Sequence, residues 1–306
     1  MNKEFNSKHF KLEKIRNGIY AAIVKEGGGA AANAGFIDLG GTTIVFDTFN
    51  TQQSSLDLKY AAETIANQPV TWVINSHWHG DHIRGNQTFK GSTIISSQMT
   101  YDEMKIAHPS RISKQKNDID GLRNYIRSLK DQLTQTYDRN LEDQINFLSE
   151  LEISLPTLEL TLPQQIFKDE VMFRGTKRSA KLFTLGGGHS LCDAMLYIPE
   201  DRVIFMGDLL FVDCHPTFFE ESNPQRWIQI LKEVEKMDID IAIPGHGSVG
   251  TNINFLQVID YIHNLTSIVQ EKNEIETLQL PNDYKNWPSP QIYHQNIKTL
   301  KELLHC

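Results

Sequence analysis

The sequence Ser76-His77-Trp78-His79-Gly80-Asp81-His82 places three imidazoles and one carboxylate in six consecutive positions, His77 to His82. Neutral imidazole and carboxylate are natural ligands of a borderline divalent ion such as zinc. Imidazoles this close together repel when they are protonated, so a cation that keeps the rings deprotonated stabilises the cluster. The stretch therefore indicates a metal site. Its spacing is too compact for two ligands on one face of a zinc-binding helix.

An apolar run, residues 69–75, directly precedes this cluster. Its composition predicts a buried strand that ends at Ser76. The cluster would then occupy the loop after a strand, where α/β proteins place their chemistry.

Three later positions complement the cluster, and each follows an apolar run that predicts a strand. His189 follows residues 181–185, Asp208 follows residues 202–206, and His246 follows residues 240–243. The order of strand, small residue and ligand therefore occurs four times in the chain.

Taken together, these motifs resemble the metallo-β-lactamase superfamily, whose pattern is H-x-H-x-D-H followed by a single His, a single Asp and a last His. Every one of those positions is filled here. Asp47, in Ile44-Val45-Phe46-Asp47-Thr48, matches an upstream aspartate that braces the first loop in the family. The resemblance covers roughly residues 15–100 and 165–250.

The resemblance implies two zinc ions, although iron or manganese would accept the same ligand types. It assigns the first ion to His77, His79 and His189, and the second to Asp81, His82 and His246, with Asp208 bridging. It also implies a metal-bridging hydroxide as the nucleophile. Asp81 would orient that nucleophile as well as bind metal, and Asp47 would hold the loop through hydrogen bonds.

Two positions discriminate among branches of the superfamily. A glutamate at position 79 would suggest the di-iron flavoprotein branch, whereas His79 points to hydrolysis. Asp208 stands where one lactamase class has a cysteine and another has no bridging ligand. Together with His82 it is closer to glyoxalase II and the lactonases.

These features predict an enzyme, a metal-dependent hydrolase that acts on a small carbonyl substrate: a thioester, lactone, β-lactam or ester. The alternative is a phosphodiesterase or nuclease on the same metal site. A one-iron oxidoreductase of sulfur compounds would need only the first ligand set, and a non-catalytic protein would not need the ligands at all.

Two side chains near the predicted ligands leave alternatives open. Cys192 follows His189 by three residues, and we interpret it as a small packing residue or as a soft ligand. His215, in Asp213-Cys214-His215-Pro216, is either a hydrogen-bonded loop histidine or a substrate-side proton donor.

The expected fold is an α/β, four-layer αβ/βα metallo-β-lactamase-like sandwich that spans residues 1–306 as a single domain. Apolar residues recur at helical spacing within a charged segment, about residues 100–151, and predict an inserted hairpin of two helices. The insertion would shape the pocket, pack on the domain, or form a homodimer surface. A helical tail covers about residues 252–306.

Composition limits the partners. No apolar run approaches the roughly 20 residues of a membrane helix, and the first residues contain no apolar signal segment. The three cysteines suggest no disulfide framework, so the cytoplasm is the expected compartment. The net charge of −8, without a basic segment interleaved with aromatic residues, disfavours nucleic acid as a partner. The expected partner is a small-molecule substrate.

Overall fold

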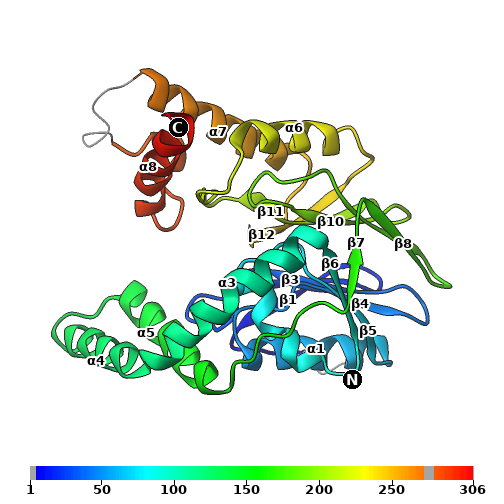
Figure 1. Ribbon diagram of the computed structural model, residues 1–306, viewed down its shortest axis with the longest axis horizontal. Coiled ribbons are helices and arrows are strands. Elements are labelled where there is room, and N and C mark those ends of the chain that lie inside the picture. Colours follow the sequence, from blue (N-terminus) through cyan, green and yellow to red (C-terminus); the bar gives the residue numbers. More distant parts are fainter. Residues whose placement is uncertain (1–4, 272–278, 306) are drawn as a thin grey trace. The chain divides into compact units, whose positions relative to one another are not determined.

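The computed structural model describes residues 5–271 and 279–305 of the 306-residue chain. The chain divides into two compact units. The first contains the described residues up to Lys168 together with Met172–Ala180, and the second contains Asp169–Val171 and the described residues from Lys181 onward. Each unit combines β-strands with helices (Figure 1).

A seven-stranded sheet, whose strands lie side by side in chain order, organises the first unit. The pairs among its first four strands are antiparallel, and those from the fourth to the seventh strand are parallel. The third and fourth strands are buried at every position, in keeping with their largely apolar sequence. The strands are β1 (Phe10–Arg16), β2 (Ile19–Val24), β3 (Ala34–Asp38), β4 (Thr43–Phe46), β5 (Val70–Ile74), β6 (Thr93–Ser97) and β7 (Gln165–Phe167).

The crossover between β4 and β5 is made by α1 (Gln52–Ala66). The Thr51 side chain caps the start of this helix by accepting a hydrogen bond from the Ser54 amide, and the helix ends at Asn67 in a left-handed conformation. Its buried Leu58 belongs to the apolar core of the sheet. The predicted alternation of strand, helix and strand is therefore confirmed, with β4 and β5 parallel.

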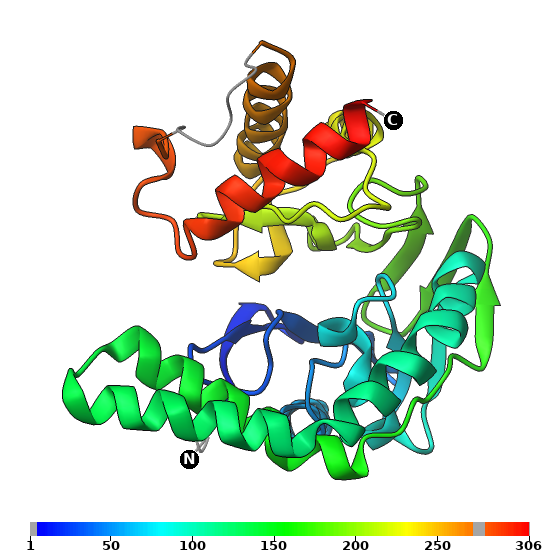
Figure 2. The same cartoon turned by 60° about the vertical axis from the view of Figure 1, so that its left-hand side comes forward.

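Three helices follow β6: α3 (Gln98–Asn117), α4 (Ile119–Gln135) and α5 (Arg139–Ser154). The two predicted helices correspond to α4 and α5, which lie side by side (Figure 2). Their apolar stripes pack on each other around Ile126, Leu129 and Ile145. The helix α3 was not predicted from the sequence. Its apolar residues are few and dispersed and it contains Pro109, so it shows little helical periodicity.

The second unit contains a five-stranded sheet in the order β12-β11-β10-β9-β8. β10 pairs antiparallel with β9 and β11, whereas β12 pairs parallel with β11. The strands are β8 (Glu170–Arg174), β9 (Ser179–Thr184), β10 (Ala194–Ile198), β11 (Val203–Val212) and β12 (Ile241–Gly247). This arrangement brings the segments that carry Asp208 and His246 into neighbouring strands.

Three helices of the second unit pack on its sheet through a continuous apolar core (Figure 1). They are α6 (Pro224–Val234), α7 (Ile253–Glu271) and α8 (Gln291–His305). Asn223 caps α6 and Pro224 occupies its first turn, a favourable start for a helix. The helical tail predicted for about residues 252–306 is present in its described part. Residues 272–278 and Cys306 lie outside the described residues.

The expected α/β fold class is confirmed by the two sheets and their packed helices. The organisation of residues 1–306 as a single domain stays a prediction. Within the described residues, every helix is too short or too polar to cross a lipid bilayer.

Candidate metal centre

The first unit gathers His77, His79, Asp81 and His82 directly after β5. The segment ends in a short helical turn, α2 (Gly80–Ile83), for which His79 is the N-cap residue. The Nε2 atom of His77 lies 3.0 Å from Nδ1 of His79, and the rings of His77 and His82 are 4.3 Å apart. Asp81 Oδ2 lies 3.7 Å from His82 Nε2. The structure therefore places four of the predicted ligands next to one another.

The buried Asp47 side chain supports the segment that carries His77 to His82. Its carboxylate accepts hydrogen bonds from the Ser76 amide at 2.8 Å and the Ser76 hydroxyl at 2.7 Å, and it lies 2.8 Å from His82 Nδ1. Three hydrogen bonds to one carboxyl group are the pattern of an ionised acceptor, so Nδ1 of His82 carries the proton and Nε2 is the nitrogen that can bind a metal. Burial raises the pKa of Asp47, and His82 and Ser76 oppose that shift.

The backbone of Asp47 is left-handed, with a φ of 61°. Side chains other than glycine rarely adopt this conformation, although aspartate and asparagine tolerate it better than most. The next residue, Thr48, donates its amide to the carbonyl of His82 at 2.8 Å. The sharp turn after β4 therefore contacts both ends of the ligand segment, through Ser76 and through His82.

The second unit brings together His189, Asp208 and His246. The Nε2 atoms of both histidines lie close to Oδ2 of Asp208, at 3.2 Å for His189 and 3.3 Å for His246. The ring of His246 stacks on Phe211 with their centroids 5.1 Å apart. A Cβ atom at Gly245 would collide with the Asp208 carboxylate, so this close approach requires glycine.

The loop that carries His189 is held by Asp193, which accepts hydrogen bonds from the amides of Gly188 at 2.8 Å and His189 at 3.0 Å. It also accepts a hydrogen bond from the Ser190 hydroxyl at 2.6 Å. Each ligand set is thus supported by a buried aspartate that is not itself a predicted ligand. His189 follows β9, as predicted from the sequence.

The prediction that Asp208 and His246 follow strands is wrong. Asp208 lies within β11 and His246 within β12. The ladder between these strands shifts register between Phe205 and Phe211, with Gly207 at a φ of 52°. The irregular ladder lets a polar ligand lie inside an otherwise apolar strand, which the end of an apolar run does not reveal.

The donor set fits a divalent cation. The carbonyl oxygen of Thr217 can only accept, so Nδ1 of His189, at 3.1 Å from it, carries the proton. In the neutral ring Nε2 then presents a lone pair to the buried Asp208 carboxylate. Two acceptors that face each other repel unless a cation or an added proton lies between them. The His/Asp groups of the chain can therefore hold metal ions, and their chemistry leaves the identity of the metal open.

The two residues with open alternatives lie in the second unit. Cys192 Sγ is 3.4 Å from the Thr184 hydroxyl. His215 is buried, with Nδ1 3.0 Å from the Tyr261 hydroxyl, and burial lowers its pKa to about 4. Because Tyr261 accepts a hydrogen bond from the Asn296 amide, its hydroxyl proton is available to His215. The substrate-side role of His215 stays a prediction.

Three side chains near the ligand segment were missed by the sequence analysis. His108, in α3, lies 2.7 Å from the Trp78 carbonyl through Nε2, and burial lowers its pKa to about 4. Arg111 lies over the Trp78 ring at 4.6 Å. Arg84 follows the ligand segment, and burial lowers its pKa, against the opposing charge of Asp81. The spacing of His108 and Arg111 puts them on one helix face, but no sequence signal identifies the segment that this face contacts.

Comparisons with known proteins identify the family of the chain. The family model described as the metallo-beta-lactamase superfamily matches residues 27–246. No curated protein sequence matches the chain significantly.

Similar solved structures include a metallo-beta-lactamase from Pontibacter korlensis, with a TM-score of 0.59 and 13% identity over 84% of this chain and 100% of that one. The DIM-1 metallo-beta-lactamase, in a crystal exposed to ceftazidime, gives a TM-score of 0.59 and 13% identity over 85% and 99% of the two chains. At such low identity these likenesses establish the fold alone.

Proposed function

The chain belongs to the metallo-beta-lactamase superfamily, and from this premise we propose that it is a binuclear zinc-dependent hydrolase of a small carbonyl substrate. The supporting observation is the set of seven ligand side chains, four gathered in one unit and three in the other. Thioesters, esters, lactones and β-lactams are the proposed substrate class. The reaction adds the oxygen of water to the carbonyl carbon, breaks the bond from that carbon to sulfur, oxygen or nitrogen, and transfers a proton to the leaving atom.

We propose that the ligands divide as the family pattern implies. His77, His79 and His189 would hold one ion, Asp81, His82 and His246 the other, and Asp208 both. When bound, such ions lower the pKa of water and polarise a carbonyl oxygen. Iron or manganese would also accept these ligands.

The side chains of the protein have separate tasks in this proposal. Asp81 is the proposed carboxylate ligand of the first unit, and its side chain is 28% exposed. It can therefore accept a proton from an incoming water and orient that water toward the carbonyl carbon. Asp47, which is buried, fixes the ring of His82 and never reaches the substrate.

Two measurements test the proposal. Zinc reconstitution followed by elemental analysis should give close to two zinc ions per chain. Finding no bound zinc would refute the proposed metal centre. A hydrolysis panel of thioesters, esters, lactones, β-lactams and phosphodiesters then identifies the bond. Turnover confined to phosphodiesters would replace the proposed reaction by that of a phosphodiesterase or nuclease.

A matched pair of variants tests the role of Asp81. Asp81→Ala should abolish hydrolysis while the far-ultraviolet circular dichroism stays that of the wild type. Asp131→Ala removes an exposed carboxylate from α4 and should leave turnover unchanged. Equal turnover of Asp81→Ala and the wild type would remove Asp81 from the mechanism.

Two further proposals concern the setting of the enzyme. A cytoplasmic location is supported by cysteine usage, because neither Cys192 nor Cys214, the two cysteines among the described residues, forms a disulfide. A homodimer through the α4–α5 hairpin is supported by exposed apolar side chains there, Tyr125 and Tyr137 among them. Light scattering on the purified chain measures the oligomeric state.

A further inference from the structure

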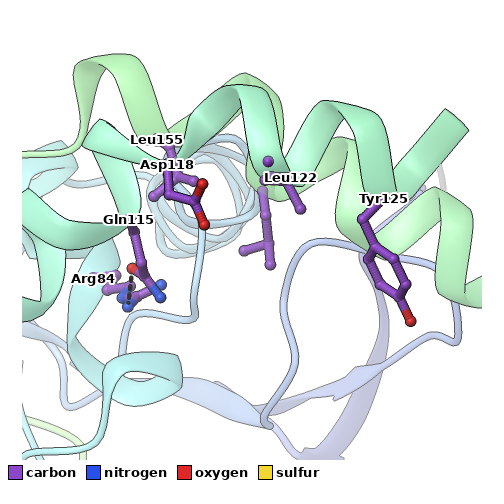
Figure 3. A pocket seen from close by; sticks show the side chains of 8 residues that line it. Arg84, Gln115, Asp118, Leu122, Tyr125 and Leu155 are labelled. Carbon is purple, nitrogen blue, oxygen red and sulfur yellow. Dashed lines mark hydrogen bonds between the residues drawn. The ribbon is translucent and has the colours of Figure 1, made fainter.

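A cavity of about 300 Å³ lies in the first unit, beside the helical insertion (Figure 3). Its lining comes from the end of α3, the first turns of α4, the C-terminal part of α5 and Arg84, which begins the 3₁₀ helix η1 (Arg84–Phe89). A volume of this size is at the lower end of the range for ligand sites. At roughly 30 Å³ for each heavy atom, the share of a water molecule in the liquid, it accommodates about ten heavy atoms.

The polar end of the cavity is built around the guanidinium of Arg84. This group donates from Nη2 to Gln115 Oε1 at 2.8 Å and from Nη1 to Asn50 Oδ1 at 3.4 Å. Its Nε atom is buried and has no hydrogen-bond partner among the described residues. The guanidinium as a whole lines the cavity, and an acceptor oxygen brought by a ligand would bind it through its Nη atoms.

The same arginine connects the cavity to the ligand segment. A Cβ atom added at Gly80 would lie 2.8 Å from Arg84 Nε, so this nitrogen rests directly on the backbone between His79 and Asp81. A ligand oxygen held at Arg84 is therefore adjacent to the proposed metal ligands. Asp118 also lines the cavity, and its negative charge disfavours a multiply charged group such as a phosphate.

The rest of the cavity is apolar. Leu122, Leu151 and Leu155 form its walls, and the half-exposed ring of Tyr125 lies at the end away from Arg84 (Figure 3). Aliphatic walls with a single hydrogen-bonding end match a ligand that has one polar end and a straight hydrocarbon chain.

We propose that this cavity takes the aliphatic chain of an acyl substrate of about eight carbons, with the acyl group at the Arg84 end, toward the ligand segment. The inference rests on the proposed hydrolase function and narrows its substrate to medium-chain acyl thioesters or esters. Octanoate, the acid that hydrolysis would release, contains ten heavy atoms and serves as the probe.

The first test measures binding without turnover. Octanoate is added to the zinc-loaded full chain, and nuclear Overhauser effects are recorded between its methylene protons and the methyl groups of Leu122 and Leu151. We expect these effects, together with octanoate affinity at least tenfold above that of acetate, which shares the carboxylate but lacks the chain. Equal affinities without these effects would overturn the proposal.

Variants then separate the two ends of the cavity. Leu122→Trp fills the apolar part and Arg84→Gln removes the polar end, and each should weaken octanoate binding about tenfold or more. Ile106→Trp adds the same bulk at an exposed site, and Arg127→Gln removes an exposed charge, so both should bind like the wild type. If Leu122→Trp fails to fold, Leu151→Phe tests the same wall, and wild-type affinity in a folded wall variant would contradict the proposal.

The second test varies chain length. kcat/KM for acyl thioesters should rise by up to about fourfold per methylene from two carbons to eight, and then stop rising. Hydrolysis that is indifferent to chain length would refute the cavity proposal and leave the hydrolase standing. Binding of octanoate that is tighter than that of acetate, without hydrolysis of any thioester or ester, would support the cavity proposal and refute the proposed hydrolase function.

Discussion

The substitution Asp47→Asn tests how the ligand segment is prepared for metal. The asparagine side chain has nearly the same shape, and asparagine tolerates the left-handed backbone at this position, so the change is chemical rather than steric. One carboxylate oxygen becomes an NH₂ group. Because Oδ1 serves the Ser76 amide and Oδ2 serves His82 Nδ1, either orientation of the new amide sets two donors against each other.

The size of the effect follows from these contacts. One hydrogen bond to a charged acceptor is lost, which should lower the free energy of unfolding of the metal-free protein by about 1.5–3 kcal/mol. If His82 moves its proton to Nε2 to accept from the new amide, that nitrogen can no longer bind metal. Loss of such a supporting contact typically weakens metal binding by about 10–100-fold.

Competition against a chromophoric zinc chelator measures the affinity, and urea unfolding followed by circular dichroism measures the stability. Asp38→Asn is the matched control, because Asp38 is a buried aspartate of the same unit that accepts from the Gly40 amide and the Lys177 ammonium, away from the ligands. It should lower stability and leave zinc affinity unchanged. A folded Asp47→Asn protein with wild-type zinc affinity would refute the reasoning.

Further predictions concern stability and pH. Burial lowers the pKa of His215 to about 4, so as the pH falls from 6.5 toward 4 only the unfolded state gains the proton, and the folded state loses stability. In His215→Phe the decrease in melting temperature from pH 7 to pH 5 should therefore be smaller than in the wild type. An identical decrease in the two proteins would contradict this origin. His108→Leu strands the buried Trp78 carbonyl and should cost about 1–3 kcal/mol in urea unfolding, an unchanged midpoint being the contrary result. Gly85→Ala pushes a Cβ atom into the Thr48 carbonyl and should cost about 1–3 kcal/mol, which calorimetry would detect. Removing bound metal with a chelator should lower the melting temperature; at a zinc concentration of about 100 times Kd the lost stabilisation is about 2.7 kcal/mol, and no change would mean that metal does not bind the folded state.

Much of the fold was predictable from the sequence because apolar periodicity and ligand spacing are local properties. The run before Ser76 forms a strand, α1 forms the crossover, and the apolar stripes around Ile126 and Ile145 pack on each other as helices do. The family motifs identified the candidate ligand positions within these elements. Each unit then brings its own ligands together, as the contacts of His77 with His79 and of Asp208 with His246 show.

Other features were inaccessible because they depend on long-range packing. The continuation of β11 through Asp208 depends on an irregular ladder with β12, which no single-strand pattern encodes. α3 is stabilised by buried contacts such as that of His108 with Trp78 rather than by its own periodicity. The contact of Arg84 with Gln115 and its place in the cavity lining depend on how the helical insertion folds beside it.

The helical insertion contacts the ligand segment through His108 and Arg111, which hold Trp78, and through Gln115, which holds Arg84. None of these residues is a proposed metal ligand. Mutations in α3, α4 and α5 can therefore accumulate over evolutionary time without removing a ligand. The insertion is the part of the chain where descendants of one ancestral enzyme could diverge toward new substrates while they inherit the same reaction.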